Sequence, residues 1–283
     1  MRIVKAAMIG DVVGNAGIET LEAYLPELRR RENLDLVTVN GENAADGYGM
    51  TEKDFRRIIA AGADVVTSGN HVWEKRDFWT ILETERNMLR PANYPADSLK
   101  TQSLSGTGFT NIYENGVSWL VINLQGREFM TAIDCPFRCF DKLVGIYSGR
   151  ATDIHPLISD DGSSVSSAFP IILVDFHAES SREKEALAYY ADGRAALIAG
   201  THTHVQTADE KILPKGSGYI TDLGMTGITD SVIGMEPNIC LERARKQVMY
   251  RMETAPAKTP GRMQGIIAEI DTEMVRAVSI KRI

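Results

Sequence analysis

The stretch that decides the fold runs from Pro170 to Gly200 and reads PIILVDFHAESSREKEALAYYADGRAALIAG. A short run rich in Ile, Leu and Val is followed by a polar segment with helical spacing and then by a second apolar run. This order predicts a strand, a helix and a second strand parallel to the first. Because such crossovers are right-handed and cover the sheet, the strands are expected to be buried on both faces.

The same alternation recurs on the N-terminal side of this unit. The apolar runs IVKAAMIG, LDLVTVN and ADVVTSG each precede a segment with helical spacing, of which one has Thr51 as its predicted N-cap and ends at Gly62. Two further pairs of extended runs predict hairpins, one turning at Asn115–Gly116 and one at the C-terminus. Together these elements predict an α/β fold, a layered sandwich with mixed sheets.

Composition indicates one ordinary globular domain. The chain has 283 residues, of which 43% are hydrophobic and 24% charged, and it contains no repeat or low-complexity linker. We therefore expect a single domain over residues 1–283, with an irregular excursion or lid at about 127–168, where no clear period is found. The net charge of −7 gives no general attraction for polyanions, so strong general nucleic-acid binding is not expected and phosphate contacts must be local.

The N-terminal apolar run is too short and too charged for a secretory signal. Lys5 interrupts it and Asp11 ends it, and no stretch approaches the ~20 apolar residues of a membrane span, so a cytoplasmic protein is expected. Three cysteines fit that compartment. Cys135 and Cys139 could share a metal or a disulfide, but the odd count favours free thiols.

The functional argument rests on the residues that follow the predicted strands. Each of five apolar strands delivers Asp, Glu, Asn or His at or just past its carboxyl end, the place where open α/β sheets bind ligands. Four of the chain's five histidines are among them. A single such histidine is more often a hydrogen-bonded rim residue, but this clustering predicts a metal site. The predicted ligands are Asp11, Glu42, Asn43, Asn70, His177, His202 and His204.

The ligand types and their number point to a hydrolytic centre with two metal ions. Imidazole, carboxylate and carboxamide donors without cysteine favour Fe, Mn or Zn over a structural zinc cage. Seven donors exceed what one tetrahedral ion needs, so we expect two ions ~3.5–4 Å apart, with Glu42 as the bridging carboxylate. Such a pair supplies a bridging hydroxide near neutral pH, which suits phosphoester hydrolysis best and would also serve amide hydrolysis.

Two further residues are candidates for catalysis and substrate binding. His71 directly follows Asn70, and adjacent residues seldom bind one ion together, so we expect His71 to donate a proton to the leaving group. The alternative is that His71 only orients a ligand through a hydrogen bond. Arg127 is the best candidate for a phosphate contact, because a guanidinium grips two oxygens at once, although a surface ion pair is the alternative.

The order of the motifs adds a resemblance to a known family. With GD, NGEN, GNH, DFH and GTHTH in this order, the chain resembles the calcineurin-like metallophosphoesterases. The match is closest to the bacterial YmdB-type phosphodiesterases and covers nearly the whole chain, including RPANYP, INLQGR and ILPKGSGYITDLGMTG. Each motif alone is weak, whereas the ordered set is specific.

The resemblance implies a fold, a ligand arrangement and an activity. The fold would be a four-layer αββα sandwich around two mixed β-sheets. One ion would be held by Asp11, Asn43 and His204, and the other by Asn70, His177 and His202. Glu42 would bridge the ions, which would be iron or manganese, and His71 would be the proton donor. The substrates would be 2′,3′-cyclic nucleotides or related small phosphodiesters.

The chain departs from the wider superfamily in two motifs. Asp11 is followed by two valines, so the histidine of the usual D-x-H motif is missing, and Asn43 is its expected replacement. The second motif lacks its usual arginine, which leaves the phosphate mostly to the metals. Two alternatives stay open at this point: a phosphomonoesterase or nucleotidase with the same centre, and a regulatory protein with a non-catalytic metal site. A homo-oligomer is compatible with either.

Overall fold

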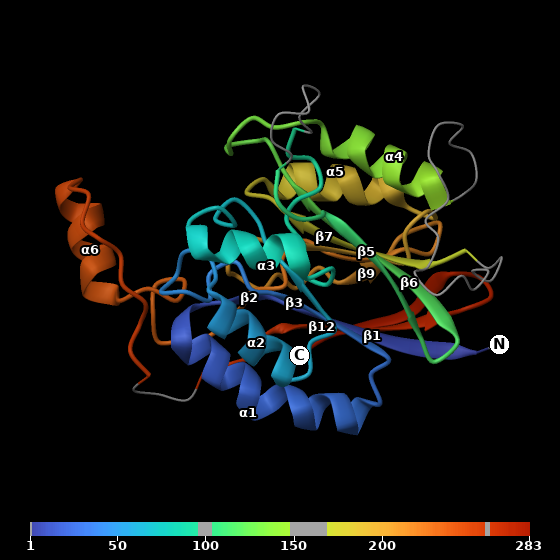
Figure 1. Ribbon diagram of the computed structural model, residues 1–283, viewed down its shortest axis with the longest axis horizontal. Helices are drawn as coiled ribbons and strands as arrows, with labels where there is room; N and C mark the ends of the chain where they lie inside the picture. The colour runs from blue at the N-terminus through green and yellow to red at the C-terminus, as the bar shows by residue number, and fades with distance from the viewer. Residues whose placement is uncertain (1, 96–103, 148–168, 258–260) are drawn as a thin grey trace.

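The computed structural model describes residues 2–95, 104–147, 169–257 and 261–283 (Figure 1). In chain order its elements are β1 (Ile3–Ile9), β2 (Asp11–Val12), α1 (Gly14–Glu32), β3 (Leu36–Asn40), α2 (Glu52–Ala60), β4 (Val65–Thr67), the 3-10 turn η1 (Arg76–Phe78), α3 (Trp79–Thr84), β5 (Phe109–Glu114), β6 (Val117–Gln125), α4 (Pro136–Tyr147), β7 (Ile171–His177), α5 (Ser181–Ala191), β8 (Leu197–Thr201), β9 (Lys211–Ile212), β10 (Gly218–Ile220), β11 (Met225–Thr226), α6 (Pro237–Lys246), β12 (Gly265–Asp271) and β13 (Arg276–Arg282).

The strands form two large mixed sheets. The first has the order β13-β12-β1-β3-β4, and its parallel half is β1, β3 and β4. The second has the order β5-β6-β7-β8-β10-β9, with parallel pairing from β6 to β10 and antiparallel strands at both edges. A separate two-stranded pair joins β2 to β11.

Three apolar layers hold the elements together (Figure 1). Helices α1 and α2 cover the outer face of the first sheet, and α4 and α5 cover the outer face of the second. The two sheets pack face to face through a third layer, in which Met8 of β1 and Ile266 of β12 lie in one cluster with Trp119 of β6 and Leu173 of β7. The expected four-layer αββα sandwich is therefore confirmed.

Local signals in the sequence account for most element boundaries. Helix α5 begins at Ser181, as its polar segment predicts, with Ser180 as N-cap accepting from the backbone N–H of Glu183. Thr51 caps α2 in a reciprocal capping box with Asp54. The hairpin between β5 and β6 turns at Asn115 and Gly116, whose φ values of 50° and 74° fit a tight hairpin turn.

Part of the region 127–168, which was expected to be irregular, forms a helix. Residues Pro136–Tyr147 form helix α4, and Phe140 and Leu143 bury themselves against the second sheet. The expectation of an irregular excursion is wrong for these residues, whose short amphipathic pattern runs directly into a polar stretch. For His155, in that polar stretch, the sequence favours an exposed loop histidine, but residues 148–168 lie outside the described residues.

Two smaller expectations concern thiols and membranes. Cys135, Cys139 and Cys240 are free, which confirms the interpretation from the odd count. Burial raises the pKa of the Cys139 thiol to about 11. Among the described residues, none of the helices combines the length and apolar character needed to cross a bilayer.

Candidate metal centre

The predicted donors gather where the carboxyl ends of the strands meet. His177 is the last residue of β7, and His202 follows β8 directly. Glu42 and Asn70 lie on the loops that leave β3 and β4. Asp11 begins β2, whose pairing with β11 fixes its backbone beside Met225. The seven candidates thus come from both sheets and form two adjacent groups.

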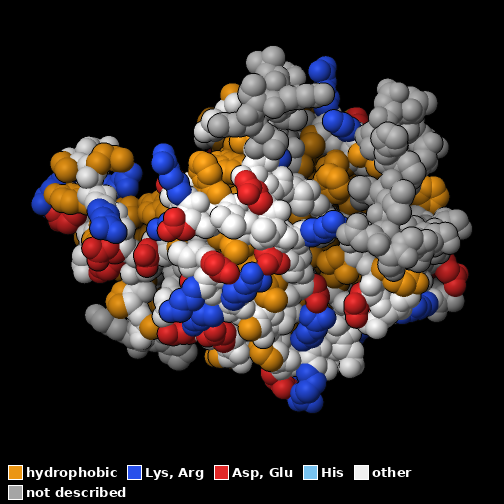
Figure 2. All heavy atoms as spheres, viewed as in Figure 1, with side chains coloured by type: hydrophobic (Ala, Val, Ile, Leu, Met, Phe, Trp, Pro, Cys, Tyr) orange, Lys and Arg blue, Asp and Glu red, His pale blue; other side chains and the backbone are white. Residues whose placement is uncertain are grey.

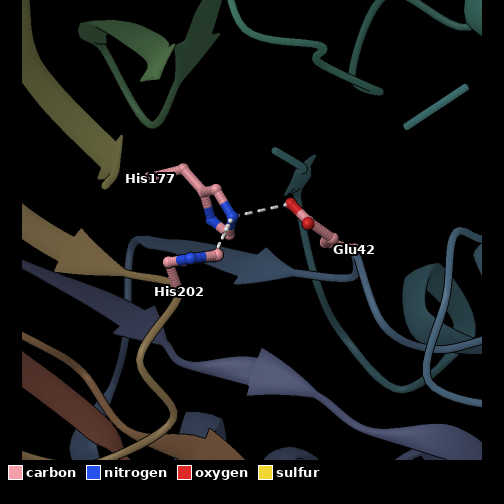
Figure 3. Close-up of side chains that lie close together, drawn as sticks. All are labelled: Glu42, His177 and His202. Atoms are coloured by element: carbon pink, nitrogen blue, oxygen red, sulfur yellow. Dashed lines mark hydrogen bonds and ion pairs between the residues drawn. The ribbon is translucent and has the colours of Figure 1, made fainter. Parts of the chain in front are cut away.

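The first group surrounds one nitrogen of His177; we call it the His177 group. Nε2 of this ring lies 3.0 Å from Oε2 of Glu42 and 3.0 Å from Nδ1 of His202 (Figure 3). The same nitrogen lies 3.2 Å from Oδ1 of Asn70. Four polar atoms therefore converge on one point, and the ligand atoms of Glu42, His177 and His202 lie within 4.8 Å of one another.

A hydrogen-bond relay determines which nitrogen of His177 carries its proton. Nδ1 of His177 lies 3.0 Å from the Thr201 hydroxyl, and that hydroxyl donates its own proton to Asp175 at 2.7 Å. The hydroxyl can therefore only accept from His177, so Nδ1 bears the hydrogen and Nε2 presents a lone pair. Asp175 also accepts from Asn40 at 3.1 Å and from Thr67.

His202 follows the same pattern with another partner. Its Nε2 lies 3.1 Å from Oε2 of Glu179, which accepts a hydrogen bond from the ring N–H and leaves the lone pair of Nδ1 facing His177. Glu179, two residues after His177 in the chain, thus pairs with His202. Histidines fixed by an acceptor on one nitrogen are typical of metal ligands.

The second group consists of Asp11, Asn43 and His204; we call it the His204 group. Nδ1 of His204 donates to the backbone carbonyl of Ile233 at 2.8 Å, so Nε2 carries no hydrogen and presents a lone pair. That nitrogen lies 3.0 Å from Nδ2 of Asn43 and 3.7 Å from Oδ1 of Asp11. Asn43 also donates to Asp11 at 3.4 Å. Rotation of this amide would present its oxygen in place of the nitrogen.

Short links hold the two groups side by side. The backbone N–H of His202, from the first group, donates to Oδ2 of Asp11 in the second at 3.2 Å. Glu42 and Asn43 are consecutive, with one in each group. Oε1 of Glu42 accepts from the backbone N–H of His71 at 3.1 Å. Within the His177 group, Glu42 contacts His177 through Oε2. That Glu42 bridges two ions stays a prediction.

Burial places carboxylates beside neutral histidines, so the negative charge in this arrangement lacks a positive partner. Asp11 and Glu42 are 0% and 1% exposed, and loss of water raises the pKa of both carboxyl groups. Burial also lowers the pKa of His177 to about 3 and that of His202 to about 4, so these rings are neutral near pH 7. None of the described residues donates a hydrogen bond to Oε2 of Glu42. A buried carboxylate oxygen without a donor beside neutral imidazoles is an environment that a cation satisfies.

Gly69 leaves the space in which the His177 group assembles. A Cβ atom at this position would lie 1.9 Å from Oε2 of Glu42 and 2.3 Å from Nε2 of His177. Any side chain would therefore displace the donors. Gly69 is the first residue of the GNH motif. Its role depends on Glu42 and His177, which are distant in sequence, so the motif alone does not reveal it.

His71 lies at the rim of the centre. Its backbone contacts Glu42, whereas its ring is partly exposed, with Nδ1 3.4 Å from Oε1 of Glu74 and the ring edge-on to Tyr48 at 5.0 Å. Nε2 is thereby left for a ligand. Within the described residues, no hydrogen bond or ion pair joins the ring to a side chain of either group, and the role of His71 as proton donor stays a prediction.

Arg127 lies apart from the two groups. It is exposed, and its guanidinium donates to Sγ of Cys135 at 3.6 Å. It also borders a surface cavity of about 490 Å³ together with Arg182 and Glu128. No hydrogen bond or ion pair within the described ranges joins Arg127 to the seven ligand candidates, so its contact with phosphate stays a prediction.

On the face seen in Figure 2, basic and acidic side chains are interspersed. Among the described residues, ion pairs such as Arg57 with Glu22 and Arg56 with Glu85, each at 2.7 Å, join such side chains. Because opposite charges alternate, neither a positive nor a negative electrostatic potential dominates that face.

Comparison with known proteins places the chain in a family. The model of the family described as YmdB-like protein matches residues 7–283. A curated relative from Bacillus subtilis, named 2′,3′-cyclic-nucleotide 2′-phosphodiesterase, is 40% identical over 97% of this chain and 94% of the relative.

Two solved structures agree with that match over the full chain. One, a hypothetical protein from Thermus thermophilus, has a TM-score of 0.83 and 36% identity, and the alignment covers 99% of this chain and 98% of the other. The second, described as a novel phosphatase from Mycoplasma pneumoniae, has a TM-score of 0.85 and 30% identity, with 100% and 93% covered. The chain therefore belongs to the YmdB-like protein family.

Proposed function

We propose that this protein is a metal-dependent phosphodiesterase that acts on 2′,3′-cyclic nucleotides or related small phosphodiesters. One observation carries the proposal: Oε2 of Glu42, Oδ1 of Asn70 and Nδ1 of His202 all face the lone pair of His177 Nε2 within 3.2 Å. With Glu42 ionised and the histidines in the tautomers described above, none of these atoms has a proton to donate, so they repel one another unless a cation lies between them.

The donor set fits two ions. The His177 group would hold one ion and the His204 group the other, with Glu42 shared between them. Nitrogen and oxygen donors without sulfur favour iron or manganese, and zinc is compatible with the same set. Two bound cations would supply Lewis acidity to a phosphate and lower the pKa of a water molecule.

The remaining residues supply what the ions do not. His71 would donate a proton from Nε2 to the leaving ribose oxygen, while Glu74 holds the ring through Nδ1. Buried Asp175 and exposed Glu179 would keep His177 and His202 in the tautomers that bind a cation. Arg127 would contact the phosphate only if the substrate extends toward α4.

The substrate class follows from the relatives and is open to direct test. The Bacillus subtilis relative is named for 2′,3′-cyclic nucleotides, whereas the Mycoplasma genitalium relative, 30% identical, is named a putative phosphatase/phosphodiesterase. The second name makes a phosphomonoesterase with the same centre the competing function.

The test compares rates on bis-p-nitrophenyl phosphate and p-nitrophenyl phosphate, and on 2′,3′- and 3′,5′-cyclic nucleotides. We expect preference for the diester and for the 2′,3′-cyclic substrates. A clear preference for the monoester would support the competing function. Absence of hydrolysis with two ions bound would favour a regulatory protein whose metal site is not catalytic.

A further inference from the structure

The loop between β8 and Asp209 carries two candidate ligands in an unusual backbone conformation. His202 and His204 have φ values of 97° and 64°, in a region that L-residues seldom adopt without support. Their side chains enter different donor groups, so the residue between them, Thr203, must hold the turn that separates the groups.

Thr203 is bound twice by one buried carboxylate. Oδ2 of Asp222 accepts from the backbone N–H of Thr203 at 3.1 Å and from its hydroxyl at 2.8 Å. Asp222 also holds the end of the loop through its backbone, since its N–H donates to the Thr207 hydroxyl at 2.9 Å and its carbonyl accepts from Thr207 N at 3.1 Å. Asp222 is 0% exposed.

A buried lysine completes the arrangement from the opposite side. Nζ of Lys184, in α5, lies 2.7 Å from Oδ2 of Asp222, and both side chains are 1% exposed. Gly200 of β8 makes room for it, because a Cβ there would lie 2.7 Å from Cδ of Lys184. The backbone N–H of Gly224 donates to Oδ1 of Asp222 at 2.9 Å, so the carboxylate accepts from four donors, three of them at Oδ2.

Stability alone does not explain an ion pair at this position. Desolvation of two charges offsets most of their attraction, and an apolar pair of similar volume commonly stabilises a fold at least as well. A carboxylate, however, can accept from Lys184 and from both donors of Thr203 at once. The pair therefore provides what an apolar pair cannot, a fixed position for the turn between the two histidines.

We propose that Lys184 and Asp222 form a positioning pair that sets the separation of His202 and His204 through Thr203. This role rests on the proposed function, because it presumes that the histidines bind ions. Neither residue of the pair reaches the substrate. Lys184 neutralises a carboxylate that would otherwise be an unpaired buried charge, and the Oδ2 atom of Asp222 is occupied by Lys184 and both donors of Thr203.

The test uses substitutions at Thr203, which is only partly buried and changes little else. Thr203→Val removes the hydroxyl donor at constant shape, and Thr203→Ser keeps it. Titration of the metal-free proteins with Mn²⁺ should show a ~10–100-fold weaker affinity for the valine variant, the range found for residues that orient ligands. The serine variant should bind as the wild type does.

A second pair of variants separates positioning from general stability. Asp222→Asn keeps one oxygen for Thr203 and should lose less Mn²⁺ affinity than Asp222→Ala. Asp192→Asn is the control, since Asp192 is a buried carboxylate that accepts from Ser217 N and Lys215 N away from the site. We expect it to lower the melting temperature of the metal-free protein and to leave Mn²⁺ affinity unchanged.

The outcomes are distinct. Wild-type binding of Mn²⁺ together with unaltered affinity in Thr203→Val would overturn the positioning role and leave the proposed function standing. A loss of affinity in Asp192→Asn as large as in Thr203→Val would also overturn it, because general stability would then explain both. A wild-type protein that binds no Mn²⁺ would overturn the proposed function and the positioning role with it.

Discussion

The His177 group and the His204 group stand side by side, yet they are built differently. In the first, the ring of His177 is fully buried and its partner Thr201 is anchored to Asp175 between the sheets. In the second, His204 depends on a carbonyl from Ile233, an exposed residue with a φ of 50° on the segment that leads to α6.

The two groups also differ in how far they are satisfied without an ion. In the His177 group, Oε2 of Glu42 accepts no hydrogen bond from the residues that the structure describes, whereas Asn43 donates to both Asp11 and His204 in the other group. The second group must therefore turn an amide before it can bind. We infer that the His177 group is arranged in advance and binds its ion more tightly than the His204 group.

The largest effect is expected from Gly69→Ala. The new Cβ would lie within 2.3 Å of Glu42 Oε2 and of His177 Nε2, so the His177 group could not assemble. Loss of affinity and turnover should exceed the ~100-fold upper range for residues that merely orient ligands. Elemental analysis and hydrolysis assays measure both quantities.

The control for this change is Gly227→Ala. A Cβ there would meet Val13 at 3.5 Å, an ordinary contact, so metal content and turnover should stay near those of the wild type. Equal losses in both variants would show that the His177 group has no special need for Gly69.

A large but different effect is expected from His71→Ala. The ring lies outside both groups, so two ions should remain bound while turnover of 2′,3′-cyclic nucleotides falls ~10²–10⁴-fold, as expected for loss of general acid catalysis. The loss should be smaller for bis-p-nitrophenyl phosphate, whose leaving group needs little protonation. Loss of metal together with activity would contradict the donor role.

Asn43→Ala tests the difference between the two groups directly. The substitution removes a donor from the His204 group only, so titration with Mn²⁺ should show one tight equivalent and a weakened second. Asn70→Ala is the matched variant in the His177 group and should weaken the tighter equivalent instead. If both variants lose the same equivalent, the division into two groups is wrong.

The smallest effect is expected from Glu179→Gln. Glu179 contacts Nε2 of His202 at 3.1 Å, but its side chain is 51% exposed, and the amide oxygen of glutamine can still accept the same proton. Mn²⁺ affinity should fall by about 10-fold or less. Isothermal titration against the wild type checks this, and a loss as large as that of Asn70→Ala would mean that charge, not orientation, is what Glu179 provides.

Much of this architecture follows from local sequence signals. The order of apolar runs and helical segments predicts β7, α5 and β8, because both periods and caps are encoded within a few residues. Since the carboxyl ends of parallel strands lie at one edge of a sheet, the sequence alone predicts that the candidate donors lie close together. Helix α4 was not predicted from the sequence, because its short amphipathic segment is followed directly by a polar one.

The supporting contacts could not be predicted because they join distant segments. Thr201 reaches His177 from the neighbouring strand, and Asp222 reaches Thr203 from beyond β10. The contact of Ile233 with His204 is made by a backbone carbonyl, which any residue type could supply, so the sequence does not indicate it. Which histidine Glu179 orients depends on the loop conformation, which proximity in sequence does not encode.

The most direct test of the central claim is a titration of metal-free protein with Mn²⁺ while hydrolysis of a 2′,3′-cyclic nucleotide is followed. We predict no hydrolysis before metal is added, little with the first equivalent and the full rate as the second binds. A full rate with one equivalent or none, or no hydrolysis with two bound, would contradict the account of a two-ion phosphodiesterase.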